Sequence, residues 1–185
     1  MNLLPRFRRV LVAGVAAAAA TSALTGFASA PAQQHTPPEI NVPAGHHLFL
    51  VGHAVGVQIY TCDGSTWGSA TPRADLFEDD AHTQLIVTHF GGPTWEARDG
   101  SSIVGVLPPQ GSVTVDPTAI PWLLLDVDPV DPSETPGRLA ATTYVQRVET
   151  TGGLAPAAAD CNAGTANKVV EVPYTSDYNF WKADG

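Results

Sequence analysis

The feature that most constrains this chain is a succession of short β-branched runs, each closed by glycine or proline. The 185 residues include 17 glycines and 16 prolines. In the segment VQIYTC, residues 57–62, β-branched side chains occupy every second position, which is the period of a strand with two different faces. No stretch of the mature chain carries a long 3.6-residue period with helix caps. The chain is therefore predicted to be all-β, as an antiparallel β-sandwich or barrel with long loops.

Nine runs are expected to form the strands of this fold, with Gly52 separating the first two. They are residues 47–51, 55–62, 84–90, 94–98, 102–107, 121–127, 140–148, 168–172 and 178–181. The pair Asp99-Gly100 predicts a hairpin turn of type I′, which needs positive φ at both central residues. The acidic, proline-rich stretch 128–137 is expected to be a surface loop.

The N-terminus has the pattern of a secretory signal peptide over residues 1–32. Three arginines come first, an apolar run over 10–24 follows, and small residues end the segment, so the cut is expected after Ala30 or Ala32. A polar tail over 33–42 and a single β domain over 43–182 follow. No later segment is long and apolar enough for a transmembrane span. The mature protein is therefore predicted to be secreted, either extracellular or associated with the cell surface.

Two cysteines, Cys62 and Cys161, permit a single pairing. In an exported chain an even number of cysteines favours disulfide chemistry, and the bond would join an early strand to a late loop. Two free thiols are the alternative that the residues alone leave open.

The charge balance argues against nucleic acid as a partner. Lys and Arg number nine against eighteen Asp and Glu, and three of the nine basic residues lie in the signal peptide. The mature chain therefore carries a formal charge of −12. Such a chain repels a phosphate backbone and an anionic membrane surface alike.

The established sequence motifs of catalysis and cofactor binding are missing. There is no G-x-S-x-G elbow, no phosphate-binding loop, and no G-x-G-x-x-G after a strand, so the chain is not expected to be an NAD-dependent dehydrogenase. Five histidines lie near the β-runs without a recognised zinc spacing. Prolines interrupt the acidic stretch 128–137, which argues against calcium. We therefore expect neither a metal nor a cofactor.

The segment HFGGPTWEARDGS, residues 89–101, holds the weak catalytic candidates His89, Glu96 and Asp99. In an extended strand, residues three apart face opposite sides, so the two carboxylates do not converge by local geometry. Aromatic residues give a second kind of candidate, because tryptophan and tyrosine stack on sugars or bind proteins when exposed. Trp67 and Trp95 lie near turns among polar residues, where exposure is expected.

The order of several segments resembles the DUF3455 family of secreted bacterial and fungal proteins. The segments are VPAGHHLFLVGHAVGVQIYTCDGSTW, HFGGPTWEARDGSSIVGV, PWLLLDV, TYVQRVETTGGLAPAAADC and VPYTSDYNFW. The positions that match its pattern are Gln58, Tyr60, Cys62, His89, Pro93, Thr94, Trp95, Asp99, Gly100, Ser101 and Cys161. The resemblance implies an extracellular domain of undefined function, and it supports a disulfide between the two cysteines. It assigns no catalytic role.

The main functional hypothesis is a secreted binding or surface-associated module for a polysaccharide or protein ligand. Its expected contacts are Tyr60, Trp67, His89 and Trp95. The alternative is a secreted enzyme of hydrolase type that uses His89 with Glu96 or Asp99 as acid and base.

Overall fold

The computed structural model describes residues 36–127 and 136–185, and within them the chain is built almost entirely of strands. The strands are β1 (His46–Thr61), β2 (Thr71–Phe77), β3 (Leu85–Phe90), β4 (Thr94–Ala97), β5 (Ser102–Val106), β6 (Ser112–Val113), β7 (Trp122–Val127), β8 (Thr142–Gly152) and β9 (Val169–Ala183). The short 3-10 helices are η1 (Pro38–Ile40), η2 (Ala158–Asp160) and η3 (Ala163–Thr165). The segment predicted to be a signal peptide and most of the acidic stretch lie outside the described residues. In the described ranges, no helix has the length and apolar character needed to cross a bilayer.

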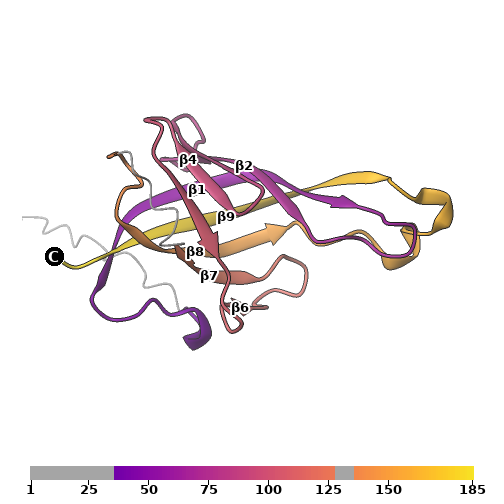
Figure 1. Cartoon of the computed structure of the whole chain (residues 1–185), viewed down its shortest axis with the longest axis horizontal. Helices are drawn as coiled ribbons and strands as arrows, with labels where there is room; N and C mark the ends of the chain where they lie inside the picture. Colours follow the sequence, from indigo (N-terminus) through magenta and orange to yellow (C-terminus); the bar gives the residue numbers. More distant parts are fainter. Residues whose placement is uncertain (1–35, 128–135) are drawn as a thin grey trace, which may run out of the picture. The chain divides into compact units, whose positions relative to one another are not determined.

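Eight of the strands close into an antiparallel barrel, which is one of the two architectures expected from the sequence (Figure 1). Their order is β5-β4-β3-β2-β1-β9-β8-β7, and β5 pairs again with β7. The first residues of β7 pair with β6 and its last residues pair with β5. An eight-stranded barrel has an interior just wide enough to be filled by side chains or to hold one small ligand.

Strand alternation places one hydrophobic cluster inside the barrel and a smaller one on its outer face. The inner cluster includes Leu76, Val87, Trp95, Val145 and Phe180, all of which are buried. The outer cluster consists of Ile40, Trp122, Leu124 and Val148, so η1 covers the outer faces of β7 and β8. Both faces of β7 are therefore apolar, which explains why PWLLLDV reads as a continuous hydrophobic run.

Strand β1 is continuous, whereas the sequence analysis predicted a break at Gly52. The glycines serve a different purpose here, because they let β2 approach closely. A Cβ at Gly56 would lie 2.2 Å from the carbonyl oxygen of Arg73, and one at Gly52 would lie 2.9 Å from Leu76 Cδ2. The predicted runs 168–172 and 178–181 are likewise joined in one strand, β9.

The hairpin between β4 and β5 is confirmed, but its turn differs from the predicted type I′. Gly100 adopts φ of 86°, whereas Asp99 does not have positive φ. The Asp99 carboxylate instead accepts hydrogen bonds from the backbone N–H of Ser101 and of Arg138, at 3.0 and 2.6 Å. These bonds hold the turn from the side chain, so a single left-handed residue is sufficient.

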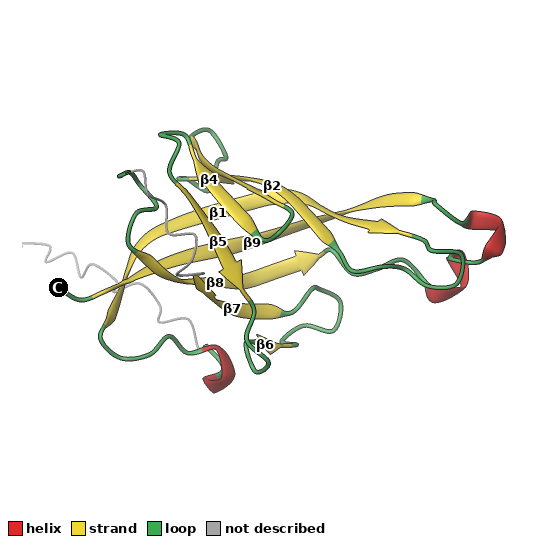
Figure 2. Ribbon diagram, viewed as in Figure 1, coloured by secondary structure: helices red, strands yellow, loops and turns green. Residues whose placement is uncertain are grey.

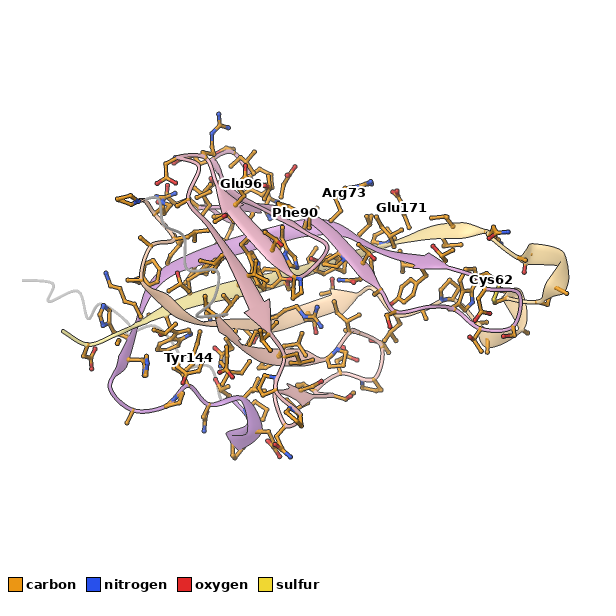
Figure 3. All side chains as sticks on the ribbon, viewed as in Figure 1. Cys62, Arg73, Phe90, Glu96, Tyr144 and Glu171 are labelled. Atoms are coloured by element: carbon orange, nitrogen blue, oxygen red, sulfur yellow. A yellow bond between two sulfur atoms is a disulfide. The ribbon has the colours of Figure 1, made fainter. Side chains whose placement is uncertain are left out.

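The predicted disulfide joins Cys62 to Cys161, with the two Cα atoms 5.4 Å apart. Strands β1 and β9 pair side by side and continue past the other strands to the segment that contains η2 and η3 (Figure 2). Cys62 lies in this extension, far from the labelled residues of the barrel (Figure 3). The bond closes a loop that contains β2 to β8, for which the chain-entropy model gives about 4.7 kcal/mol.

Candidate functional site

A cavity of about 350 Å³ opens at the end of the barrel where β2, β4 and β7 begin and where β3 and β5 end. Its volume lies near the lower limit for small-molecule sites, which is roughly 300 Å³. Leucine, isoleucine and proline side chains form much of its wall. The polar and aromatic residues that line it are Gln58, Tyr60, Thr71, His89, Trp95, Arg147 and Tyr178. They come from β1, β2, β3, β4, β8 and β9.

His89 is a lining residue of the cavity and lies between two aromatic rings. It stacks on Trp95, with ring centroids 4.4 Å apart and planes 6° from parallel, and it meets the edge of Tyr178 at 5.1 Å. His89 and Trp95 are direct partners across β3 and β4, which explains the stacking. Burial lowers the pKa of His89 to about 4, so the ring is neutral at pH 7. Its Nδ1 donates to the carbonyl oxygen of Thr94 at 2.8 Å, which leaves the lone pair on Nε2.

Two buried N–H groups of the lining residues have no hydrogen-bond partner among the described residues. They are Nε2 of Gln58 and Nε1 of Trp95, on side chains that are 3% and 1% exposed. Tyr60 differs from them, because its hydroxyl donates to the carbonyl oxygen of Gly153 at 2.7 Å. A buried donor without a partner costs about 1–3 kcal/mol, so such groups are rare and deserve an explanation.

Arg147 brings a positive charge to the cavity. Arg147 and Val145 are two residues apart on β8, so their side chains point to the same side of the strand. Val145 belongs to the inner cluster, and Arg147 therefore also faces the interior of the barrel. Its Nε and Nη2 donate to the carbonyl oxygen of Pro121 at 3.2 and 2.8 Å, which fixes the guanidinium at the cavity wall. None of the described residues that line the cavity is Asp or Glu.

The barrel brings together three of the four residues expected to bind a ligand: Tyr60, His89 and Trp95. The exposure expected for Trp95 is wrong, because strand alternation turns its indole into the interior. Trp67 lies apart from them, in the extension that contains the disulfide. Its backbone pairs with that of Cys62 in an isolated antiparallel β-bridge. Its Nε1 donates to the carbonyl oxygen of Ala157 at 3.1 Å.

The hydrolase candidates are not brought together. Glu96 is exposed on the outer face of β4, opposite Thr88 (Figure 3). His89 is buried and faces inward, where it stacks on Trp95. Asp99 accepts the hydroxyl hydrogen of Ser101 at 2.6 Å, and this bond together with backbone hydrogen bonds lowers the pKa of Asp99. The hydroxyl of Ser101 therefore points to Asp99 and not to His89. Neither Glu96 nor Asp99 lines the cavity.

Two lining residues, Gln58 and Arg147, are not among the site residues predicted from the sequence. A signal for Gln58 was present, since it shares strand parity with Tyr60 and Cys62. The signal for Arg147 was weaker. Its segment, AATTYVQRV, has apolar residues of both parities, so the inner face of this strand can be assigned only once its neighbours are known.

The other described histidines, His46, His47, His53 and His82, do not line the cavity. His47 contacts Asp184 and His53 contacts Asp177, at 2.7 and 2.8 Å. Within residues 36–127 and 136–185, no group of three histidine, cysteine or acidic side chains is arranged to hold a metal ion. Most of the acidic stretch considered for calcium lies outside these ranges.

Comparison with known proteins gives one match. The family described as "Protein of unknown function (DUF3455)" matches residues 43–182, and this confirms the resemblance seen in the sequence. No curated protein and no solved structure matches the chain.

Proposed function

The chain belongs to the DUF3455 family, whose function is unknown, and from its cavity we propose that it is a binding domain for a small organic molecule. The observation that carries this proposal is the cavity itself, a largely apolar pocket of about 350 Å³ with the guanidinium of Arg147 fixed at its wall. A ligand with acceptor oxygens would meet this donor group, and its apolar part would pack on the leucine and proline wall.

This proposal narrows the ligand expected from the sequence. A polysaccharide chain or a protein that binds through Trp95 would need an exposed indole ring, and Trp95 is only 1% exposed. A carbohydrate fits the cavity as a single sugar unit rather than as a chain laid across a surface. Among the described residues of the wall, Arg147 is the one charged side chain, and it donates to the carbonyl oxygen of Pro121. Acid–base catalysis uses paired titratable groups, so this lining favours ligand binding over catalysis.

We also propose that the domain acts outside the cytoplasm. The signal-like pattern of residues 1–32 suggests export, and the Cys62–Cys161 bond supports an oxidising compartment. N-terminal sequencing of protein collected from culture medium tests this. A mature chain starting at Pro31 or Gln33 supports export, and an intact Met1 in the cell pellet alone contradicts it.

A fragment screen by saturation-transfer NMR tests the binding function. We expect bound fragments in the wild type and their loss in Ala70→Phe, because Ala70 lines the cavity and a phenyl ring there occupies it. The control is Ala81→Phe, which adds the same ring at an exposed position outside the cavity. The proposal fails if no fragment binds the folded wild type, or if Ala70→Phe binds the same fragments as the control.

A further inference from the structure

We propose that the ligand carries a carboxylate on a small apolar body, and that Arg147 is the residue that recognises this carboxylate. The inference rests on the binding function proposed above and specifies its ligand class. It is carried by the position, the hydrogen bonding and the charge environment of Arg147.

The guanidinium of Arg147 is held in position, yet only part of its hydrogen-bonding capacity is used by the described residues. Two of its five N–H groups donate to the carbonyl oxygen of Pro121, and this single acceptor holds the plane of the group in place. No other hydrogen bond joins the guanidinium of Arg147 to the described residues, so three of its N–H groups remain. A planar fork with parallel donors fits a carboxylate in a bidentate manner.

The charge of Arg147 has no counter-ion in the described part of the chain. Arg73 and Arg138 show the contrast, since they pair with Glu171 and Glu78 at 2.8 and 3.0 Å on the surface (Figure 3 shows the first pair). An inward-facing charge without a partner is costly, and an anion that enters the cavity would compensate it.

The rest of the lining is consistent with an anion as ligand. The chain has eighteen acidic residues, yet none of the described ones faces this cavity. His89 is neutral at pH 7, because burial, with the Arg147 charge as a lesser cause, lowers its pKa. Arg147 is therefore the charged group of the described lining. Leu123 and Leu125 offer apolar contact to the body of the ligand.

Benzoate and benzamide are matched probes for this inference, because both have a phenyl ring and a carbonyl and differ in charge. Calorimetric titration of the intact protein at pH 7, in a buffer without carboxylates, is expected to show benzoate binding about 10- to 100-fold more tightly than benzamide. In Arg147→Gln, benzoate should fall to the affinity of benzamide, while benzamide changes by less than about twofold.

Two further variants separate recognition from folding. Arg147→Lys keeps the charge but loses the fork, so it should retain part of the preference for benzoate. Arg73→Gln removes a surface arginine of β2 that does not line the cavity, and both affinities should stay unchanged. An Arg73→Gln protein that loses the preference as strongly as Arg147→Gln would contradict the assignment to Arg147.

The outcomes distinguish this inference from the binding function. Equal affinity of the wild type for the two probes overturns the carboxylate inference. So does a wild type that binds neither probe but does bind neutral fragments in the cavity, and the binding function then stands. A wild type that binds no fragment of any kind overturns both.

Discussion

At the scale of single residues, the pairing of His89 with Trp95 determines how the cavity responds to pH. The imidazole is 3% exposed and stacks on an apolar ring, so a proton on it would place a charge in the interior. Its single hydrogen bond to Thr94 favours the charged form and only partly offsets the effect of burial. The lowered pKa therefore makes the folded state sensitive to mild acid.

We predict a loss of stability from His89 between pH 6.5 and pH 4. In this window the unfolded chain binds a proton at His89 and the folded chain does not, so unfolding becomes more favourable as pH falls. The difference of the two pKa values sets an upper limit of about 3 kcal/mol. Urea unfolding of the wild type at pH 7 and pH 4.5 should show this decrease, and His89→Gln should show a flatter response.

The same substitution at His46, which is half-buried and lies outside the cavity, provides the control. His46→Gln should keep the wild-type response. Carboxylates act in a lower pH range. Hydrogen bonds from Ser101 and Thr118 lower the pKa of Asp99 and Asp116, whose unfolded forms protonate near pH 3.8. The stability that these two carboxylates contribute is therefore lost mainly below the range tested for His89. A His89→Gln protein with the full wild-type slope above pH 4.5 would contradict the prediction.

At the scale of elements, the close approach of β1 and β2 depends on Gly56. We predict that Gly56→Ala destabilises the protein by about 3 kcal/mol, at the upper end of overpacking effects, because the new methyl would meet backbone atoms of β2. Thermal or urea unfolding measures the change. Gly68→Ala is the control, since the nearest atom to its methyl is the Thr61 oxygen at 3.4 Å. A similar loss in both variants would exclude close packing as the cause.

The same elements show how far the sequence predicts the fold. Local sequence patterns correctly indicate the strand positions around 55–62, 94–98 and 121–127. Period-two alternation marks the first of them, and a continuous apolar run after proline marks the last. Glycine is ambiguous, since it can end a strand or permit close packing. Strand β2 was not predicted, because TPRADLF mixes Pro, Arg and Asp with its two buried residues, Ala74 and Leu76.

Proline is ambiguous as well, since Pro173 lies within β9 and does not end it. The pairing of β8 with β9 stops at Gly152–Tyr174, so the missing N–H of Pro173 interrupts no ladder with β8.

The candidate site was less predictable than the strands. The hairpin segment identified His89 and Trp95, yet nothing local showed that they face inward. Their association with Gln58 and Arg147 requires the closed order of strands, because residues from β1, β3, β4 and β8 meet only after β5 pairs with β7. The hypothesis that Glu96 or Asp99 acts with His89 depended on their closeness in sequence. Strand alternation places Glu96 on the opposite face from His89, and Asp99 lies in the turn after β4, so neither is near His89 in the cavity.

At the scale of the whole molecule, the barrel closes where β5 pairs with β7. Within the described residues, these strands meet at Gly105–Val127 and Val106–Asp126. This seam borders the cavity, because Leu107 follows β5 directly and Leu125 belongs to β7. Residues 50–54 of β1 do not line the cavity. A ligand in the cavity is therefore expected to stabilise the seam more than this part of β1.

Hydrogen exchange followed by mass spectrometry should reveal this difference. We predict that saturating benzoate slows exchange in peptides covering residues 102–107 and 122–127, because a ligand in the cavity contacts Leu107 and Leu125. Peptides covering residues 50–54 should exchange at the same rate with and without benzoate. Equal slowing in all strands would mean that benzoate acts only on global unfolding, and unchanged exchange at the seam would contradict contact of the ligand with Leu107 and Leu125.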